Sequence, residues 1–118
     1  MSQPAVSIHP YFKIHPGKLE AAKALLPKFV EKTATEEKCV YYEFTVDGDV
    51  VFCREAYLGS EGTLAHLGNV GPLLDELLTM SDLARLEIHG PAEEIEKLKG
   101  PLASYKPTWF VYECGVKR

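Results

Sequence analysis

The chain has 118 residues, enough for one domain with a real hydrophobic core but too few for two. Its net charge is −4, and its Lys and Arg residues are spread along the chain, which disfavours a nucleic-acid partner. No apolar run approaches the roughly 20 residues that span a membrane, and the opening MSQPAVSIHP lacks the pattern of a secretory signal. We therefore expect a single soluble, cytoplasmic domain over residues 1–118, without membrane contact.

The cysteines and histidines give little support for a metal site. The three cysteines are odd in number and show no CxxC spacing, so reduced thiols are favoured over a disulfide or a metal centre; they are Cys39, Cys53 and Cys114. No two of the four histidines share a short helical spacing, and His9, His15 and His89 stand singly. We expect no bound metal and no cofactor.

The first half of the chain predicts a strand, a helix and a hairpin. Residues 5–14 alternate as a strand, in which Pro10 cannot donate a ladder hydrogen bond and so indicates an edge position or a bulge. A turn at 15–17 leads into a helix with apolar residues every three or four positions, in which Pro27 should produce a kink; these are Leu19, Ala22, Leu26, Phe29, Val30 and Thr33.

Two strand-like runs, 39–46 and 50–58, flank the turn signal Asp47-Gly48-Asp49 and predict a hairpin. If Asp47 pairs with Val50, Glu43 lies opposite Arg54, a favourable cross-strand pair. The more apolar face should pack under helices; it carries Val40, Tyr42, Phe44, Val46, Val51, Cys53, Glu55 and Tyr57.

The second half repeats the alternation of helices and strands. Ser60 suits an N-cap for a helix through Leu67 that Gly68 ends, and Gly71-Pro72 begins a second helical segment. A strand at 83–89, a short charged helix at 92–98 and a strand at 108–115 follow. The last strand holds Trp109, which we expect at a dimer interface.

The resulting order is β-α-β-β-α-β, followed by a small helix and a strand, which is the ferredoxin-like α+β unit with a C-terminal extension. We place the core at 5–90 and the extension at 91–118. Helices cover only one face of such a sheet, so face-to-face homodimerisation would cover the other, with the last strand available to a partner's sheet edge.

The stretch from Val50 to Leu67 concentrates the groups that can move protons. Glu55 and Tyr57 share one strand face, and the helix that follows carries His66. A carboxylate in the layer beneath the helices is costly unless it is hydrogen-bonded or lines a cleft. An imidazole has a pKa near working pH and suits a general base.

The segment CREAYLGSEGTLAHL resembles the antibiotic biosynthesis monooxygenase (ABM) family of dimeric α+β barrels, in which an acidic residue, an aromatic residue and a helix histidine follow in this order. Glu55, Tyr57 and His66 match those positions, and the likeness extends over roughly residues 5–90. It implies a pocket between sheet and helices in which small phenolic or quinol-like compounds are oxidised by dioxygen without metal or flavin. His66 would act as base, Glu55 would orient it or share its proton, and Tyr57 would hold a ring oxygen. The substrate-binding positions implied are Phe12, Tyr42, Phe44, Leu77 and Leu86.

Haem degradation, known among relatives, is disfavoured because Pro10 stands at the asparagine position and Ala56 or Tyr57 at the tryptophan position. Each candidate residue also has an alternative without a catalytic role. His66 could be a surface histidine, Glu55 could form a cross-strand ion pair, and Tyr57 could be a packing aromatic. Three functions stay open, and the resemblance favours the first. They are a cofactor-independent monooxygenase, a ligand-binding dimer without chemistry, and an isomerase or lyase.

Overall fold

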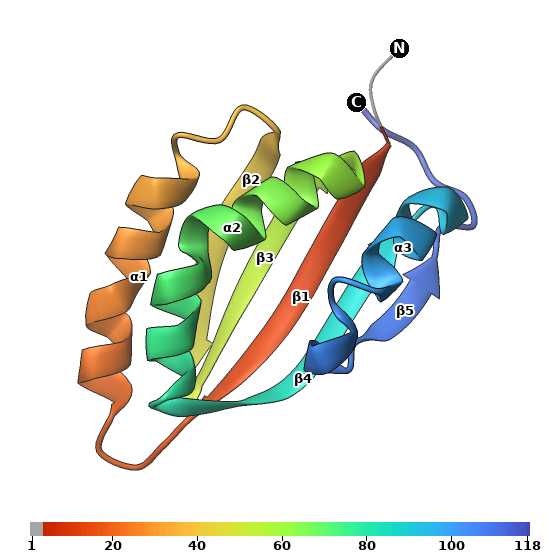
Figure 1. Ribbon diagram of the computed structural model, residues 1–118. Coiled ribbons are helices and arrows are strands. Elements are labelled where there is room, and N and C mark those ends of the chain that lie inside the picture. The colour runs from red at the N-terminus through yellow and green to blue at the C-terminus, as the bar shows by residue number, and fades with distance from the viewer. Residues whose placement is uncertain (1–3) are drawn as a thin grey trace.

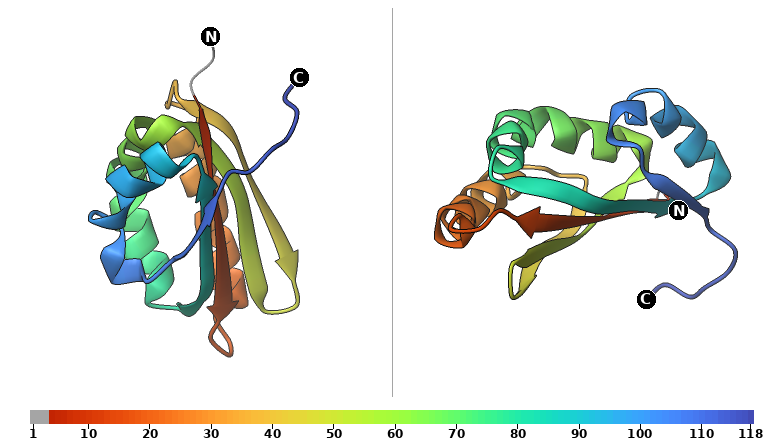
Figure 2. Two further views of the ribbon diagram at one scale, coloured as in Figure 1. Left: turned by 90° about the vertical axis from the view of Figure 1, so that its right-hand side faces the viewer. Right: turned by 90° about the horizontal axis from the view of Figure 1, so that it is seen from below.

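A computed structural model describes residues 4–118 and contains a five-stranded sheet with three helices on one face (Figures 1 and 2). The elements are β1 (Ala5–Ile14), α1 (Leu19–Thr33), β2 (Cys39–Asp47), β3 (Val50–Leu58), α2 (Gly59–Leu78), β4 (Ser81–Gly90), α3 (Ala92–Lys99), a 3-10 turn (Ala103–Tyr105) and β5 (Thr108–Val111). The strand order is β2-β3-β1-β4-β5, antiparallel except for the parallel pair β4–β5. The predicted ferredoxin-like α+β fold is confirmed. No helix within residues 4–118 is long and apolar enough to cross a membrane.

Strand β1 lies in the middle of the sheet although it contains Pro10. The ladder with β3 is interrupted between Ile8 and Tyr11, and the register against β4 shifts between Tyr11 and Phe12. The sequence allowed either an edge strand or a bulge for this proline. The edge strand is wrong, because β1 is central, and the pairing is irregular near Pro10. The missing N–H is accommodated because the ladder with β3 is interrupted at Pro10, while on the other side Pro10 still lies opposite Leu86 of β4.

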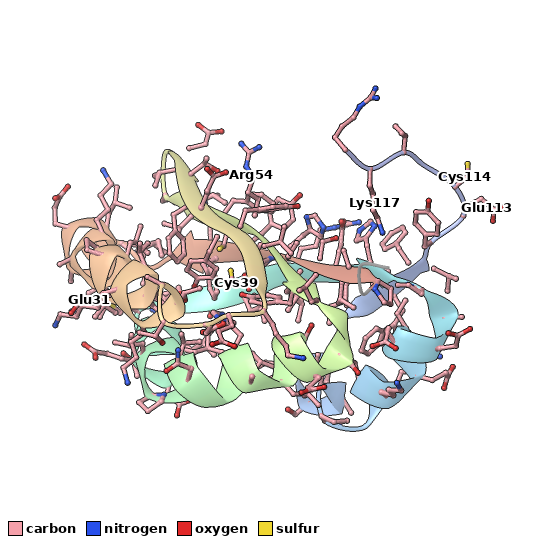
Figure 3. All side chains as sticks on the ribbon, turned by 90° about the horizontal axis from the view of Figure 1, so that it is seen from above. Glu31, Cys39, Arg54, Glu113, Cys114 and Lys117 are labelled. Atoms are coloured by element: carbon pink, nitrogen blue, oxygen red, sulfur yellow. The ribbon has the colours of Figure 1, made fainter. Side chains whose placement is uncertain are left out.

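The hairpin has the predicted register from Asp47 opposite Val50 to Glu43 opposite Arg54, but the register shifts between Cys39 and Tyr41. Val40 and Val46, expected under the helices, are 53% and 42% exposed, so that part of the predicted face is wrong. Arg54 Nε lies 3.7 Å from Glu43 Oε1, and Figure 3 shows Arg54 projecting from the sheet face that the helices leave uncovered. Both side chains are more than half exposed, so this pair stabilises the hairpin by less than about 1 kcal/mol.

Helix α2 differs from its prediction, because one helix of 20 residues replaces the two segments expected on either side of Gly68. Gly68 and Pro72 both lie inside it. The inward residues Val70 and Leu77 continue the buried stripe past the glycine, so packing on the sheet outweighs the local cost of these two residues. Ser60 is not the N-cap: its backbone N–H donates to Glu94 Oε1 of α3 at 2.7 Å.

Helix α1 runs without a break through Pro27, and its buried positions are Ala22, Leu25, Phe29 and Thr33. Val30, expected inside, is 44% exposed. The buried stripe of α1 therefore includes Leu25 in place of the predicted Leu26, and Val30 lies outside it.

The C-terminal extension closes one end of the same core. β5 pairs with β4 of its own chain, forms the edge of the sheet and ends at Val111. Trp109 is partly buried and packs against a cluster of its own chain that includes Ile88 and Leu98, on the helix-covered side of the sheet. After β5 the chain crosses to the uncovered side, where Figure 3 shows Cys114 and Lys117.

The contact between α2 and β3 depends on a glycine. A Cβ built on Gly62 would lie 2.9 Å from the Lys38 Cβ and 3.3 Å from the Tyr57 Cβ. The first turns of α2 can thus approach the end of β3 only because Gly62 has no side chain.

We predict that Gly62→Ala lowers the free energy of unfolding by about 1–3 kcal/mol, because the added methyl group must displace Lys38 or Tyr57. Gly68→Ala in the same helix is the matched control, since nothing lies within 4 Å of its Cβ position. It should raise stability by about 0.5–1 kcal/mol. Chemical denaturation of both variants measures the difference, and equal effects would contradict the close-approach explanation.

Candidate functional site

A mostly apolar cavity lies between the helix-covered face of the sheet and α1 and α2. Counting the gaps between side chains and the open mouth, the hollow measures about 620 Å³, of which about 60 Å³ is open to a water-sized molecule. The apolar side chains around it come from β1, β2, β4, both helices and the extension; they include Ile8, Phe12, Phe29, Phe44, Val70, Leu74, Leu77, Leu86 and Leu102. The ionisable groups among its lining residues are Tyr42, Cys53, Glu55, His66 and Tyr105.

Glu55 points into this cavity because the odd-numbered residues of β3 face the helices. Its side chain is 5% exposed, and the Tyr57 hydroxyl donates a 2.6 Å hydrogen bond to Glu55 Oε1. Burial raises the pKa of Glu55 to about 7, although the bond from Tyr57 opposes the shift. Near neutral pH this carboxyl group is therefore close to half protonated.

His66 projects from α2 onto the same carboxyl group. Its Nε2 atom lies 3.5 Å from Glu55 Oε1, and its Nδ1 atom lies 3.0 Å from Glu36 Oε2. The ring is 3% exposed and packs between Tyr42 and Tyr57, with centroids 5.0 and 4.7 Å away. Burial lowers the pKa of His66 while the Glu36 carboxylate raises it, with burial the larger effect. At neutral pH the imidazole is neutral and can accept a proton.

Glu36 was missed by the sequence analysis. It lies in the connection between α1 and β2, outside any periodic pattern, and Asn69 of α2 donates to its Oε2 atom at 2.8 Å. The Asn69 amide also donates to the Lys32 carbonyl at the end of α1 at 2.9 Å. Asn69 follows His66 by three residues on one helix, but nothing local indicates that both reach Glu36. The contact arises only when α1 and α2 pack side by side.

The predicted substrate-binding residues Phe12, Tyr42, Phe44, Leu77 and Leu86 all line the cavity, as do Glu55 and His66. Tyr57 is fully buried and lies behind Glu55, with its hydroxyl engaged by the carboxyl group. Within residues 4–118 no group of three or more His, Cys, Asp or Glu side chains is arranged to hold a metal ion.

The arrangement places an acid with a pKa of about 7 beside a neutral base, in surroundings that exclude most water. Such a pair can give a proton to one atom of a bound molecule and remove a proton from another. The burial that raises the pKa of Glu55 also raises the pKa of the Cys53 thiol and the Tyr42 hydroxyl. Both therefore stay protonated and can act as hydrogen-bond donors.

Comparison with solved structures identifies relatives of this chain. MupZ from Pseudomonas fluorescens is 42% identical, with a TM-score of 0.93, and the match covers 100% of this chain and 91% of that one. The chain belongs to the same family as MupZ. Because the match spans the whole chain, this family shares the C-terminal extension as well as the sheet and its helices.

Several more distant structures share the fold. A proposed antibiotic biosynthesis monooxygenase from Chloroflexus aurantiacus has a TM-score of 0.62 at 19% identity, with 75% of this chain and 93% of that one covered. A further antibiotic biosynthesis monooxygenase has a TM-score of 0.62 at 17% identity, covering 70% and 92%. The ABM resemblance found in the sequence is confirmed at the level of fold. No known family pattern and no curated protein sequence matches the chain.

We predict that Glu55 makes stability fall as the pH rises from about 4.5 to about 7. In this window the unfolded chain has lost the Glu55 proton and the folded chain still holds it, so unfolding releases a proton and is favoured by higher pH. The loss amounts to about 3 kcal/mol, from about 1.4 kcal/mol per unit of pKa shift. Glu55→Gln keeps an acceptor for Tyr57 but carries no charge, and its stability should lack this decline.

Denaturant titrations of both proteins across this pH range give the difference between their free energies of unfolding at each pH. This difference removes the contribution of the histidines, which the two proteins share. Glu20→Gln is the control, because Glu20 is exposed in the first turn of α1. A difference curve that is flat with pH would show that the Glu55 pKa is close to that of the unfolded chain.

Proposed function

We propose that this protein is an acid–base enzyme that acts on a largely apolar small molecule held in the cavity between sheet and helices. The observation that carries the proposal is Glu55: a carboxyl group with a pKa of about 7, among apolar side chains and 3.5 Å from a neutral imidazole. A carboxyl group retained only for structure would be satisfied by hydrogen bonds that hold it ionised. Burial here leaves it able to give or take a proton at neutral pH.

In this proposal Glu55 and His66 are the catalytic residues. Protonated Glu55 donates to an oxygen of the bound molecule, or ionised Glu55 removes a proton from it, and His66 Nε2 is the neighbouring base. Tyr57 is a positioning residue, because its hydroxyl donates to Glu55 and does not line the cavity. Tyr42 lines the cavity and has a raised pKa, so its protonated hydroxyl can donate to a polar atom of the substrate.

The presence of both an acid and a base favours an isomerase or a lyase. In these reactions a proton leaves one atom and another arrives elsewhere, with no net oxidation, so the two groups together complete the cycle. A cofactor-independent monooxygenase of small phenolic or quinol-like aromatic compounds is the second candidate. The ABM fold supports it, and ionised Glu55 or neutral His66 could deprotonate a phenol there.

We predict turnover that does not need oxygen. Purified protein is incubated with a panel of apolar ketones, enones and hydroxylated aromatic compounds in deuterated buffer, with and without air. Isomerisation, elimination and deuterium uptake are followed by NMR, and oxygen by an electrode. Glu55→Gln and His66→Ala should each lower kcat/KM about 10²- to 10⁴-fold, the usual contribution of a positioned acid or base.

Glu76→Gln, an exposed change near the end of α2, is the control and should leave turnover as in the wild type. Oxygen uptake in step with product would establish the monooxygenase instead. Ligands that raise the melting temperature of wild type and His66→Ala alike, with no product from either, would establish a binding protein without chemistry.

We further propose that the protein is a homodimer joined through the uncovered face of its sheet. Aromatic side chains cross this face from β3 to β5: Tyr11 and Phe52 have ring centroids 4.7 Å apart, and His89 stacks on Phe110 at 4.4 Å. His9 joins the two pairs, 4.7 Å from His89 and 6.2 Å from Phe52. A continuous aromatic surface of this kind is typical of an interface.

We predict that the wild type has twice the chain mass of 13.1 kDa and that Phe52→Glu is monomeric at the same concentration. Burying the new carboxylate at the interface would cost several kcal/mol. Light scattering after size exclusion gives the mass. Leu64→Glu, on the exposed side of α2, is the matched control and should stay dimeric. A monomeric wild type would overturn the dimer.

A further inference from the structure

A second hollow shares Tyr42 with the apolar cavity. This groove between the end of α1 and the start of β2 holds about 530 Å³ of empty space, including its open side; its lining residues are Val30, Thr33, Ala34, Glu36, Cys39 and Tyr42. Figure 3 shows Cys39 at this end of the sheet, near the connection from α1. Tyr42 lines both hollows, so the groove and the cavity share a wall.

Thr33 supplies an unpartnered polar group to the groove. The residue is 3% exposed, and no neighbour among the described residues makes a well-formed hydrogen bond to its Oγ1 atom. The nearby Tyr42 hydroxyl makes only a weak interaction with it, which slightly lowers the pKa of Tyr42. A buried hydroxyl without a partner is costly, and such groups are usually paired with an ordered water molecule. The groove has the room and a second polar group, the Glu36 carboxylate, to hold that water.

Glu36 connects the groove with the cavity. Its carboxylate lies in the groove wall, and both of its oxygens lie within 3.1 Å of His66 Nδ1. The other ring nitrogen of His66 lies 3.5 Å from Glu55 Oε1. A line of titratable atoms thus runs from the groove, through the imidazole, to the carboxyl group in the cavity.

We propose that the groove is a proton port: water held by Thr33 and Glu36 exchanges protons with Glu55 through the imidazole of His66. Glu36 is then a positioning and relay residue rather than a catalytic one, because it does not touch the cavity. The use of the port in turnover rests on the proposed function, whereas the path itself does not.

The transfers balance as follows. His66 carries its proton on Nδ1, donated to ionised Glu36, and presents the bare Nε2 to Glu55. When Glu55 has taken a proton from the cavity, it passes that proton to Nε2, and the Nδ1 proton moves to Glu36. Water in the groove then takes the proton from Glu36. The ring regains its first tautomer when Nε2, which lines the cavity, gives its proton to the bound molecule and Nδ1 takes one back from the groove water through Glu36. The bound molecule and the water have then each lost one proton and gained one, and Glu55 is ionised again. The apolar cavity can therefore stay closed around a ligand while Glu55 regains its starting state.

The port is tested on ligand-free protein by NMR of ¹⁵N-labelled histidine rings, with His66 assigned from the signal lost in His66→Gln. In the wild type we expect Nδ1 protonated and its proton exchanging rapidly with water. Glu36→Gln cannot relay a proton and should slow this exchange at least tenfold. Glu37→Gln, at the adjacent exposed carboxylate, should leave it unchanged.

Chemical rescue supplies the second measurement. Glu36→Ala opens the groove to a small carboxylate, and added formate should restore both the Nδ1 proton and the fast exchange. Thr33→Val in that background should raise the formate concentration needed about fivefold, the effect of one lost hydrogen bond.

A bare Nδ1 in the wild type, an exchange rate equal in Glu36→Gln and Glu37→Gln, or a lack of rescue by formate would each overturn the port. If Glu36→Ala does not fold, the proposal is still tested by the wild-type tautomer and by the exchange rates of Glu36→Gln and Glu37→Gln. Because no substrate is used, failure of the port and failure of the proposed enzyme activity are separate results.

Discussion

The burial of one carboxyl group in an otherwise apolar layer is the constraint on which the site depends. Glu55 occupies a position that β-strand alternation assigns to the core, and a lone ionised carboxylate there would be unstable. Three features relieve this cost: the bond from Tyr57, the raised pKa that allows protonation, and the nearby imidazole. The imidazole brings in two further residues, because His66 Nδ1 contacts Glu36 and Asn69 donates to Glu36.

These contacts join segments that are far apart in the chain and hold them in one geometry. His66 reaches Glu55 only if α2 lies close to β3, which Gly62 permits. Glu36 reaches His66 only if the end of α1 lies beside α2, and the Asn69 amide bonds to both Glu36 and the last turn of α1. The polar contacts and the close helix packing therefore support each other. Loss of either would leave a buried charge without its partner.

The sequence predicted what short-range patterns determine. Alternation and a strong turn signal identified the hairpin, its register and the face that carries Glu55, because each depends only on residues a few positions apart. The pattern could not show that α2 continues through Gly68 and Pro72, since burial against the sheet outweighs local propensity there. Glu36 could not be predicted either, because its contact with His66 forms only after α1 and α2 have packed. The sequence leaves a surface position open for His66, whereas in the structure its ring is buried by Tyr42 and Tyr57, which approach from the sheet.

The C-terminal extension forms part of the candidate site. Leu102 and Tyr105 line the same cavity as Glu55 and His66, and Trp109 packs beside them in the cluster that fixes α3 on the sheet. Glu94 of α3 also accepts the hydrogen bond from the first turn of α2, the helix that carries His66. The extension thus shapes one end of the cavity and anchors the helix that presents the base. The proton-moving groups lie within the part of the chain that resembles ABM proteins, whereas this wall comes from the segment shared with MupZ along the full chain. If the proposed acid–base function holds, Leu102 and Tyr105 are accordingly the positions where this family and other proteins of the fold would differ in the molecule they accept.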